Sequence, residues 1–330
     1  MPAAEQLRKS FGQEKRRLSR QEFVLTAPDK TDIAVYHWPD SAASTKAVVL
    51  ILHGMAEHAL RYEKFALALN AEGFAVYACD HRGHGRTGLQ AGKLGFFAAE
   101  NGWFTVAADI FNLVTRLKKD YPGLPIFLFG HSMGSYLART CLAQAGETFA
   151  GVILSGTSVE KPFIVNFGLL LSSLLLQFKK SEQESALLDY LTFGSFNKPF
   201  QPRRTKFDWL SRNTAAVDAY CADPLCGFMC TLGFFRDLFT GIRFINDETL
   251  LSKLPVKPAV LLLGGSRDPV GHMGKDLTPL ADSYRRLGFA DLSCRLYEEA
   301  RHELLQEINQ EEVIGDISTW LNQQVGKIAS

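Results

Sequence analysis

A serine between an apolar run and a helical pattern could act as a nucleophile. Residues 126–135 read Ile-Phe-Leu-Phe-Gly-His-Ser-Met-Gly-Ser, which places Ser132 at a tight strand-to-helix turn. Gly130 and Gly134 lack a Cβ atom and let neighbouring backbone pass close to that turn. Such a turn exposes the serine hydroxyl, and the following amide, that of Met133, points toward the position of an oxyanion. The pattern indicates acyl transfer, with a surface turn of the same letters as the alternative.

A serine is a poor nucleophile alone, so acyl transfer requires a histidine base and a carboxylate that orients it. Asp268 lies in a turn after the apolar run 259–264, and His302 follows the next run, 293–297. The order Ser, Asp, His, with each residue on a loop after a strand, is the order of α/β-hydrolases. The alternatives are a turn former before a proline for Asp268 and a solvated loop residue for His302.

Other carboxylates and histidines fit these two roles less well. Asp276 and Asp282 lie inside a predicted helix, from which they reach the sheet edge less easily, and His272 precedes that helix. The remaining rival histidines are His58 and His84.

The loop after the third predicted strand supplies a second oxyanion donor. Gly54 allows a sharp turn, so the Met55 amide can converge with the Met133 amide on one oxygen. His53 is expected to brace this loop rather than react. Glu57 orders the same loop through polar contacts, or lies at the surface.

Two groups of residues could suggest a metal or phosphate site. The segment 80–88 is rich in glycine, histidine and arginine, but it lacks a P-loop lysine and a G-x-G-x-x-G helix start, so a loop that supports the oxyanion segment is favoured. Three of the six cysteines, Cys221, Cys226 and Cys230, lack the spacing of a zinc site and a nearby histidine in the sequence. We therefore predict free buried thiols, no metal and no cofactor.

Alternating strand-like and helix-like segments predict an α/β protein with a mostly parallel eight-stranded sheet and helices on both faces. The first two strands precede any helix and should form an antiparallel hairpin at one edge. The predicted strands are 23–26, 33–37, 48–53, 75–80, 126–129, 152–155, 259–264 and 293–297. The predicted helices are 62–72, 104–120, 135–144, 273–287 and 310–323.

The alternation stops at residues 157–253, where no convincing strand occurs. We interpret this segment as an inserted helical cap on a core made of residues 23–156 and 254–330, after a polar extension, 1–22. Its stretch 163–178 is almost continuously apolar and suits a lid over a lipophilic tunnel. A helix pair that covers ordinary core is the alternative.

Charge and terminal composition limit the partners and the location. The net charge is +1 without a long basic run, so no nucleic-acid surface is expected. The polar N-terminus lacks the apolar region of a signal peptide, which makes a cytoplasmic location the default. The stretch 163–178 is too short and too interrupted to span a bilayer comfortably, although the cap could touch a membrane peripherally. No feature assigns an oligomeric state.

The assembled motifs give the chain a resemblance to the α/β-hydrolase superfamily. Within it, the chain is similar to the monoacylglycerol lipase and lysophospholipase group, also called the serine aminopeptidase-like hydrolases, over about residues 32–321. The resemblance implies the triad Ser132, Asp268 and His302 and the amide donors Met55 and Met133. It rests on His53-Gly54-Met55-Ala56-Glu57-His58 with Arg61-Tyr62, on Asp80-His81-Arg82-Gly83-His84-Gly85, on Gly130-His131-Ser132-Met133-Gly134, on Asp268 and on Arg301-His302-Glu303.

Two positions depart from the pattern of the group. Ser135 stands where a second glycine is common, and Met55 stands where a small residue is common. Both donors are backbone amides, so no reacting atom is lost, but both side chains are expected to reshape the acyl pocket.

The expected function is two-step hydrolysis of an ester with a lipophilic acyl chain and a modest alcohol such as glycerol or glycerophosphate. An aminopeptidase or amidase on the same fold is one alternative, and it would need an acidic group near the cap for a substrate ammonium, such as Glu160, Asp208 or Asp223. A binding protein on a hydrolase scaffold, without turnover, is the other.

Overall fold

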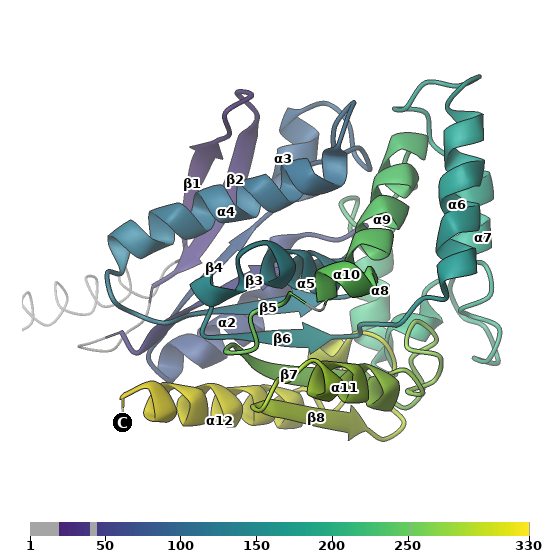
Figure 1. Ribbon diagram of the computed structural model, residues 1–330. Helices are drawn as coiled ribbons and strands as arrows, with labels where there is room; N and C mark the ends of the chain where they lie inside the picture. The colour runs from purple at the N-terminus through teal and green to yellow at the C-terminus, as the bar shows by residue number, and fades with distance from the viewer. Residues whose placement is uncertain (1–19, 40–44, 252, 330) are drawn as a thin grey trace, which may run out of the picture.

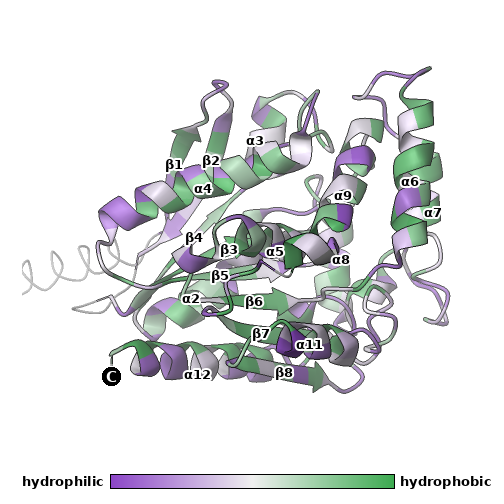
Figure 2. Cartoon of the chain, in the orientation of Figure 1, coloured by the Kyte–Doolittle hydropathy of each residue, from purple (hydrophilic) through white to green (hydrophobic). Residues whose placement is uncertain are grey.

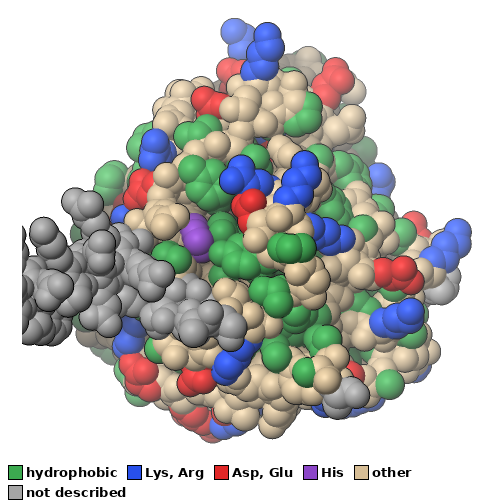
Figure 3. Space-filling model, turned by 90° about the vertical axis from the view of Figure 1, so that its left-hand side faces the viewer, with side chains coloured by type: hydrophobic (Ala, Val, Ile, Leu, Met, Phe, Trp, Pro, Cys, Tyr) green, Lys and Arg blue, Asp and Glu red, His purple; other side chains and the backbone are tan. Residues whose placement is uncertain are grey.

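The computed structural model describes residues 20–39, 45–251 and 253–329. Most of the predicted extension, 1–22, therefore lies outside the described residues. On the face in Figure 3, several basic side chains gather around an acidic one above the centre, and other basic and acidic side chains are scattered over the face.

Eight strands form one sheet, as predicted, and their order in it is β1-β2-β4-β3-β5-β6-β7-β8. The β1-β2 and β2-β4 pairs are antiparallel, and all the other pairs are parallel, so the hairpin at one edge is confirmed. The strands are β1 Gln21–Thr26, β2 Asp32–Trp38, β3 Ala47–Leu52, β4 Phe74–Cys79, β5 Ile126–His131, β6 Gly151–Ser155, β7 Ala259–Gly265 and β8 Leu292–Tyr297.

Helices cover both faces of this sheet (Figure 1). Successive strand residues point to opposite faces, so Leu50 joins one hydrophobic cluster while Val49 and Ile51 join the other. Burial on both faces explains the unbroken apolar runs of β3 and β5, which are green in Figure 2. The first cluster includes residues of α4 Gly102–Asp120, α5 Met133–Ala145 and α11 Leu277–Arg286, and the second includes residues of α2 Glu63–Ala71 and α12 Gln310–Ala329.

Some helix boundaries differ from the prediction. The helix expected at 273–287 begins at Leu277, because His272, Met273 and Gly274 all have positive φ angles, which an α-helix excludes. A short helix, α3 Gly85–Gln90, lies in the glycine-rich segment, where none was predicted. The last helix continues to Ala329 rather than ending at 323.

The described residues of the segment 157–253 carry helices only, apart from an isolated bridge between Glu184 and Thr231. Figure 1 shows these helices beside the end of the sheet toward which the arrows of β5 and β6 point. That is the end where parallel strands deliver loop residues to a site. The helices are α6 Pro162–Leu175, α7 Ala186–Phe193, α8 Thr214–Ala222, α9 Leu232–Ile245 and α10 Glu248–Leu251.

Candidate active site

Ser132 occupies the strained turn that its motif predicts. It lies between β5 and α5 with φ 52° and ψ −121°, a conformation that non-glycine residues rarely adopt. Its amide donates to the carbonyl of Ser155 at 2.9 Å, and its carbonyl accepts from the amide of Ser135 at 2.8 Å. The turn is thereby fixed at both ends, and the serine side chain stays half-buried at the start of the helix.

The two flanking glycines are required because backbone passes within contact distance. A Cβ on Gly130 would lie 2.3 Å from the carbonyl oxygen of Gly134, and a Cβ on Gly134 would lie 2.0 Å from that of Leu52. Both distances are far below van der Waals contact with atoms that cannot move freely. The first turn of α5 can therefore pack against β3 only through glycine.

We expect Gly134→Ala to destabilise the fold by about 3 kcal/mol or more, because the added methyl group overlaps backbone. Gly315→Ala is the matched control, since nothing lies within 4 Å of a Cβ there and the position is exposed within α12. That change should stabilise the protein by about 0.5–1 kcal/mol. Denaturant unfolding of the purified variants measures both effects, and equal stabilities for the two variants would contradict the packing argument.

His302 and Asp268 form a buried pair. The Nδ1 atom of His302 lies 2.9 Å from Oδ2 of Asp268, and the other Asp268 oxygen accepts from the amide of Val270 at 2.9 Å. Asp268 follows β7, and His302 follows β8. Burial alone would lower the pKa of His302, but the charge and hydrogen bond of Asp268 outweigh it and raise that pKa above 6.5. The pair thus favours a histidine that accepts a proton readily.

Ser132 and His302 line the same cavity, of about 500 Å³, together with Met55. Among the described residues, no hydrogen bond joins the Ser132 hydroxyl to His302. The ring of Trp209 lies over His302, with 5.1 Å between ring centroids, and closes one side of this cavity. The structure therefore brings the three predicted triad residues to one place, with the Asp–His contact formed.

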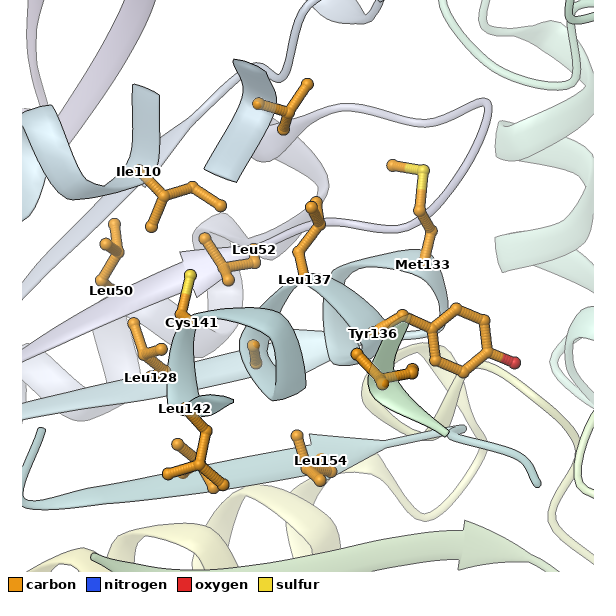
Figure 4. Close-up of a cluster of buried hydrophobic side chains, with 14 of the residues drawn as sticks. Leu50, Leu52, Ile110, Leu128, Met133, Tyr136, Leu137, Cys141, Leu142 and Leu154 are labelled. Carbon is orange, nitrogen blue, oxygen red and sulfur yellow. The ribbon is translucent and has the colours of Figure 1, made fainter. Parts of the chain in front are cut away.

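The two predicted oxyanion donors lie on either side of Ser132. Met133 is the first residue of α5, where backbone amides have no acceptor within the helix. Figure 4 shows the side chains of Met133 and Tyr136 at this end of the helix and those of Leu137 and Cys141 farther along it; all four belong to the first hydrophobic cluster. The loop of Met55 is close as well, since a Cβ on Gly54 would lie 3.3 Å from the Ser132 Cβ. In the described part of the chain, the Met55 amide has no hydrogen-bond acceptor.

A buried ion network holds the loop of Met55. Glu57 accepts from the amide of Gly54 at 2.5 Å and from the hydroxyl of Tyr62 at 2.7 Å. Arg61 donates to Glu57 at 2.6 Å and to both oxygens of Glu303, at 2.5 and 2.7 Å. Burial would raise the pKa of Glu57, but Arg61 holds it at about 2. The network therefore joins the Met55 loop to the residue after His302.

No role was predicted for Arg61 or Glu303 from the sequence, although both belong to the motifs on which the resemblance to the hydrolase group rests. Because the two residues are far apart in the sequence, their pairing could not be predicted. The signal that could have indicated this pairing was a glutamate directly after His302 and an arginine four residues after Glu57.

Buried histidines also contact the loop of Met55. His53 accepts the amide proton of His81 on Nε2 at 3.0 Å, and its Nδ1 lies 2.8 Å from the carbonyl oxygen of Gly54. Burial lowers the pKa of His53 to about 4, and that of His84 to about 3. These contacts agree with a bracing role for His53 and for the glycine-rich segment of His81 and His84.

The rival residues have other partners. Asp276 lies 2.8 Å from Nδ1 of His272, and Asp282 accepts from Arg285 at the surface. His58 contacts Asp223 at 2.8 Å. Within the described residues, Asp268 is thus the carboxylate that contacts His302.

A second cavity, of about 310 Å³, also reaches Ser132 and is lined mainly by apolar side chains. Met55 and Trp209 line both cavities, so the two chambers meet at the serine. The other residues that line the apolar cavity include Val165, Leu171 and Gly168 of α6, Leu188 of α7, and Leu238, Phe239 and Ile242 of α9. This arrangement suits a substrate with one apolar and one polar part on either side of the reacting carbon.

Comparisons with known proteins agree with this geometry. A family model described as serine aminopeptidase, S33 (Hydrolase_4) matches residues 43–309. Human monoglyceride lipase is 31% identical over 288 residues, which are 84% of this chain and 83% of that protein. The monoacylglycerol lipase of Mycolicibacterium smegmatis is 29% identical over 281 residues, or 84% and 88% of the two chains.

Among solved structures, a highly thermostable carboxyl esterase from Bacillus coagulans in complex with glycerol matches with a TM-score of 0.85. It is 27% identical and covers 93% of this chain and 99% of its own. The fold is therefore that of the α/β-hydrolases, and the chain belongs to the hydrolase family described as serine aminopeptidase, S33.

Proposed function

We propose that the protein hydrolyses esters of lipophilic acyl chains in the manner of a monoacylglycerol lipase, with Ser132 as nucleophile, His302 as general base and Asp268 as its orienting carboxylate. Family membership and the named relatives place the chain among the carboxylic ester hydrolases. The observation that carries the proposal is the meeting at Ser132 of a mostly apolar cavity and a second cavity of mixed polar and apolar lining.

In the proposed mechanism, His302 takes the Ser132 proton on Nε2 while the serine oxygen attacks the acyl carbonyl. Asp268, on the other ring nitrogen, fixes the tautomer and stabilises the imidazolium. The amides of Met55 and Met133 bind the oxyanion, and losing one such donor typically costs about 2.7–4 kcal/mol. The alcohol leaves with the proton from His302, and water then releases the acid by the same route.

The apolar cavity is the proposed acyl site. It runs between α6, α7 and α9, which belong to the proposed cap, 157–253, over the core. Glu160 is an acidic residue at its wall, and it accepts from the Ser158 hydroxyl at 2.9 Å. An acyl chain fills such a cavity by displacing water from apolar side chains.

Leu171→Trp should shorten the acyl chains that the protein accepts, because Leu171 lines this cavity. Excluding two methylene groups removes about 1.6 kcal/mol of burial, or roughly 15-fold in kcat/KM for long chains relative to short ones. Leu170→Trp is the control: Leu170 lies on the same helix with 59% of its surface exposed, and it does not line the cavity. A series of monoacylglycerols from short to long chains measures the shift, and equal profiles for both variants would exclude this acyl site.

The larger cavity, whose lining is more polar than that of the acyl site, is the proposed site of the alcohol. Asn197, Thr205, Arg203 and Lys206 line it, together with Asp189. Hydroxyl, amide and charged groups of this kind bind glycerol, and the two cations could also accept a glycerophosphate.

The proposed cap also offers a surface for peripheral contact with lipid. Within the described residues, no helix combines the length and the apolar character needed to cross a membrane. On α6 and α7, however, several large apolar side chains are exposed: Phe163, Phe167, Leu170, Leu187 and Leu191. An apolar face of this kind next to a lipid-binding cavity could deliver substrate from an interface.

Two measurements test the proposed function. A fluorophosphonate probe should label Ser132, which would exclude a binding protein without turnover. Steady-state assays should show hydrolysis of monoacylglycerols and nitrophenyl esters and none of aminoacyl amides. All three acids considered for an amidase already have hydrogen-bond partners: the Ser158 hydroxyl for Glu160, the Arg204 amide for Asp208 and the His58 ring for Asp223. Turnover of amides but not esters would overturn the proposal.

A further inference from the structure

We propose that His58, Asp223 and Cys226 form a binding site for one thiophilic divalent cation, such as Zn²⁺. Their ligand atoms, a ring nitrogen, a carboxylate oxygen and a sulfur, all lie within 4.8 Å of one another. This nitrogen, oxygen and sulfur set is typical of zinc, and three protein ligands leave a fourth position for water. The site is separate from the proposed nucleophile and base.

Two loops far apart in the sequence supply these ligands. His58 precedes the 3-10 helix Ala59–Tyr62, while Asp223 and Cys226 follow α8. The second loop is an ordered turn: the Cys226 amide donates to the Asp223 carbonyl at 3.0 Å, and the Leu225 amide donates to Asp223 Oδ1 at 2.8 Å. The sequence analysis favoured packing over a zinc site because no histidine lies near these cysteines in the sequence, whereas in the structure the histidine comes from the other loop.

The present distances need only small changes to accept an ion. Ligand atoms around tetrahedral zinc lie about 3.3–3.6 Å apart, as follows from bond lengths of about 2.0–2.3 Å. Nε2 of His58 and Oδ2 of Asp223 are 2.8 Å apart, so they would separate slightly around the ion. The sulfur would move inward on a turn that is half-buried rather than fixed in the core.

The surrounding charge favours a cation. Three carboxylates, those of Glu57, Glu303 and Asp223, act electrostatically on Cys226, and the guanidinium of Arg61, which has the largest single effect of the four, opposes them. Arg61 is already paired with both glutamates, at 2.6 and 2.5 Å. Binding would form the metal–sulfur bond and release the thiol proton to solvent.

A bound ion would connect the proposed cap to the Met55 loop. The residues beside the ligands already meet this loop: the Gly227 amide and the Tyr220 hydroxyl both donate to the carbonyl of Ala56, at 2.9 Å each. An ion between His58 and Cys226 would add a third link there. It would therefore stabilise this contact without touching the substrate.

Metal titration of the full chain tests the proposal. After chelator treatment, the wild type should bind one Zn²⁺, and Co²⁺ in its place should give the near-ultraviolet thiolate-to-cobalt absorption. Cys226→Ser should abolish that absorption and weaken Zn²⁺ binding at least about tenfold, as loss of a ligand requires. Cys221→Ser is the matched control, because Cys221 is an exposed free thiol on α8 outside the cluster. It should bind like the wild type.

A second variant, His58→Gln, removes another proposed ligand, so that the test does not depend on correct folding of Cys226→Ser alone. Circular dichroism and thermal unfolding establish that each variant is folded, and Zn²⁺ should raise the unfolding midpoint of the wild type and Cys221→Ser only. The proposal fails if the wild type binds no ion. It also fails if Cys221→Ser loses the absorption as Cys226→Ser does, which would indicate adventitious surface thiols. Neither outcome bears on ester hydrolysis, which the wild type would retain.

Discussion

Replacing Ser132 with alanine should reduce kcat for ester hydrolysis by about 10⁶-fold, the loss typical of a serine nucleophile in a triad. This corresponds to about 8 kcal/mol of transition-state stabilisation. The fold should survive, because the hydroxyl of Ser132 has no hydrogen bond to another described residue and the turn depends on its backbone. Steady-state kinetics and fluorophosphonate labelling measure the effect, and both signals should disappear together.

Ser135→Ala is the control for this result, because it removes a neighbouring serine hydroxyl from the same helix. Ser135 lies in the first turn of the same helix, and its hydroxyl donates to the carbonyl of Ser132 at 2.6 Å. Losing one neutral hydrogen bond costs about 1 kcal/mol, so activity should fall by less than about tenfold. Retention of full activity in Ser132→Ala, or equal losses in both variants, would remove Ser132 from the proposed role.

Local patterns were enough to predict the sheet. Strands β3 and β5 contain the short apolar runs 47–52 and 126–129, which are typical of a parallel sheet covered on both faces. The turn around Ser132 could also be predicted, because Gly130 and Gly134 each lie only two residues from Ser132 in the sequence. Features of this kind depend on neighbours along the chain.

Features that depend on residues far apart in the sequence could not be predicted from it. Arg61 and Glu303 are 242 positions apart, and His58 and Asp223 are 165 positions apart, yet both pairs form contacts. Hydropathy also could not show which side of α6 is buried: Leu171 lines a cavity, whereas its neighbour Leu170 is exposed. The three-dimensional fold decides these placements, so the substrate cavity is the part of the site that the sequence shows least.

Asp268→Asn should lower kcat by about 10⁴-fold and move the acidic limb of the pH profile to lower pH. His302 acts as a base only when neutral, so kcat/KM rises as pH increases through its pKa. Asp268 raises that pKa above 6.5 against the effect of burial, and its removal lets burial lower it.

The Asp276–His272 pair provides a close geometric control, because its Oδ2 to Nδ1 distance is 2.8 Å, against 2.9 Å for Asp268 and His302. Its histidine is about half exposed, however, and follows β7 rather than β8. Asp276→Asn should therefore leave the acidic limb in place and lower kcat by less than about tenfold, the cost of about one hydrogen bond. If Asp276→Asn moved the limb and Asp268→Asn did not, the carboxylate role would belong to the other pair. A carboxylate and a histidine in contact are not sufficient for catalysis; what distinguishes Asp268 and His302 is that their contact is buried beside the serine.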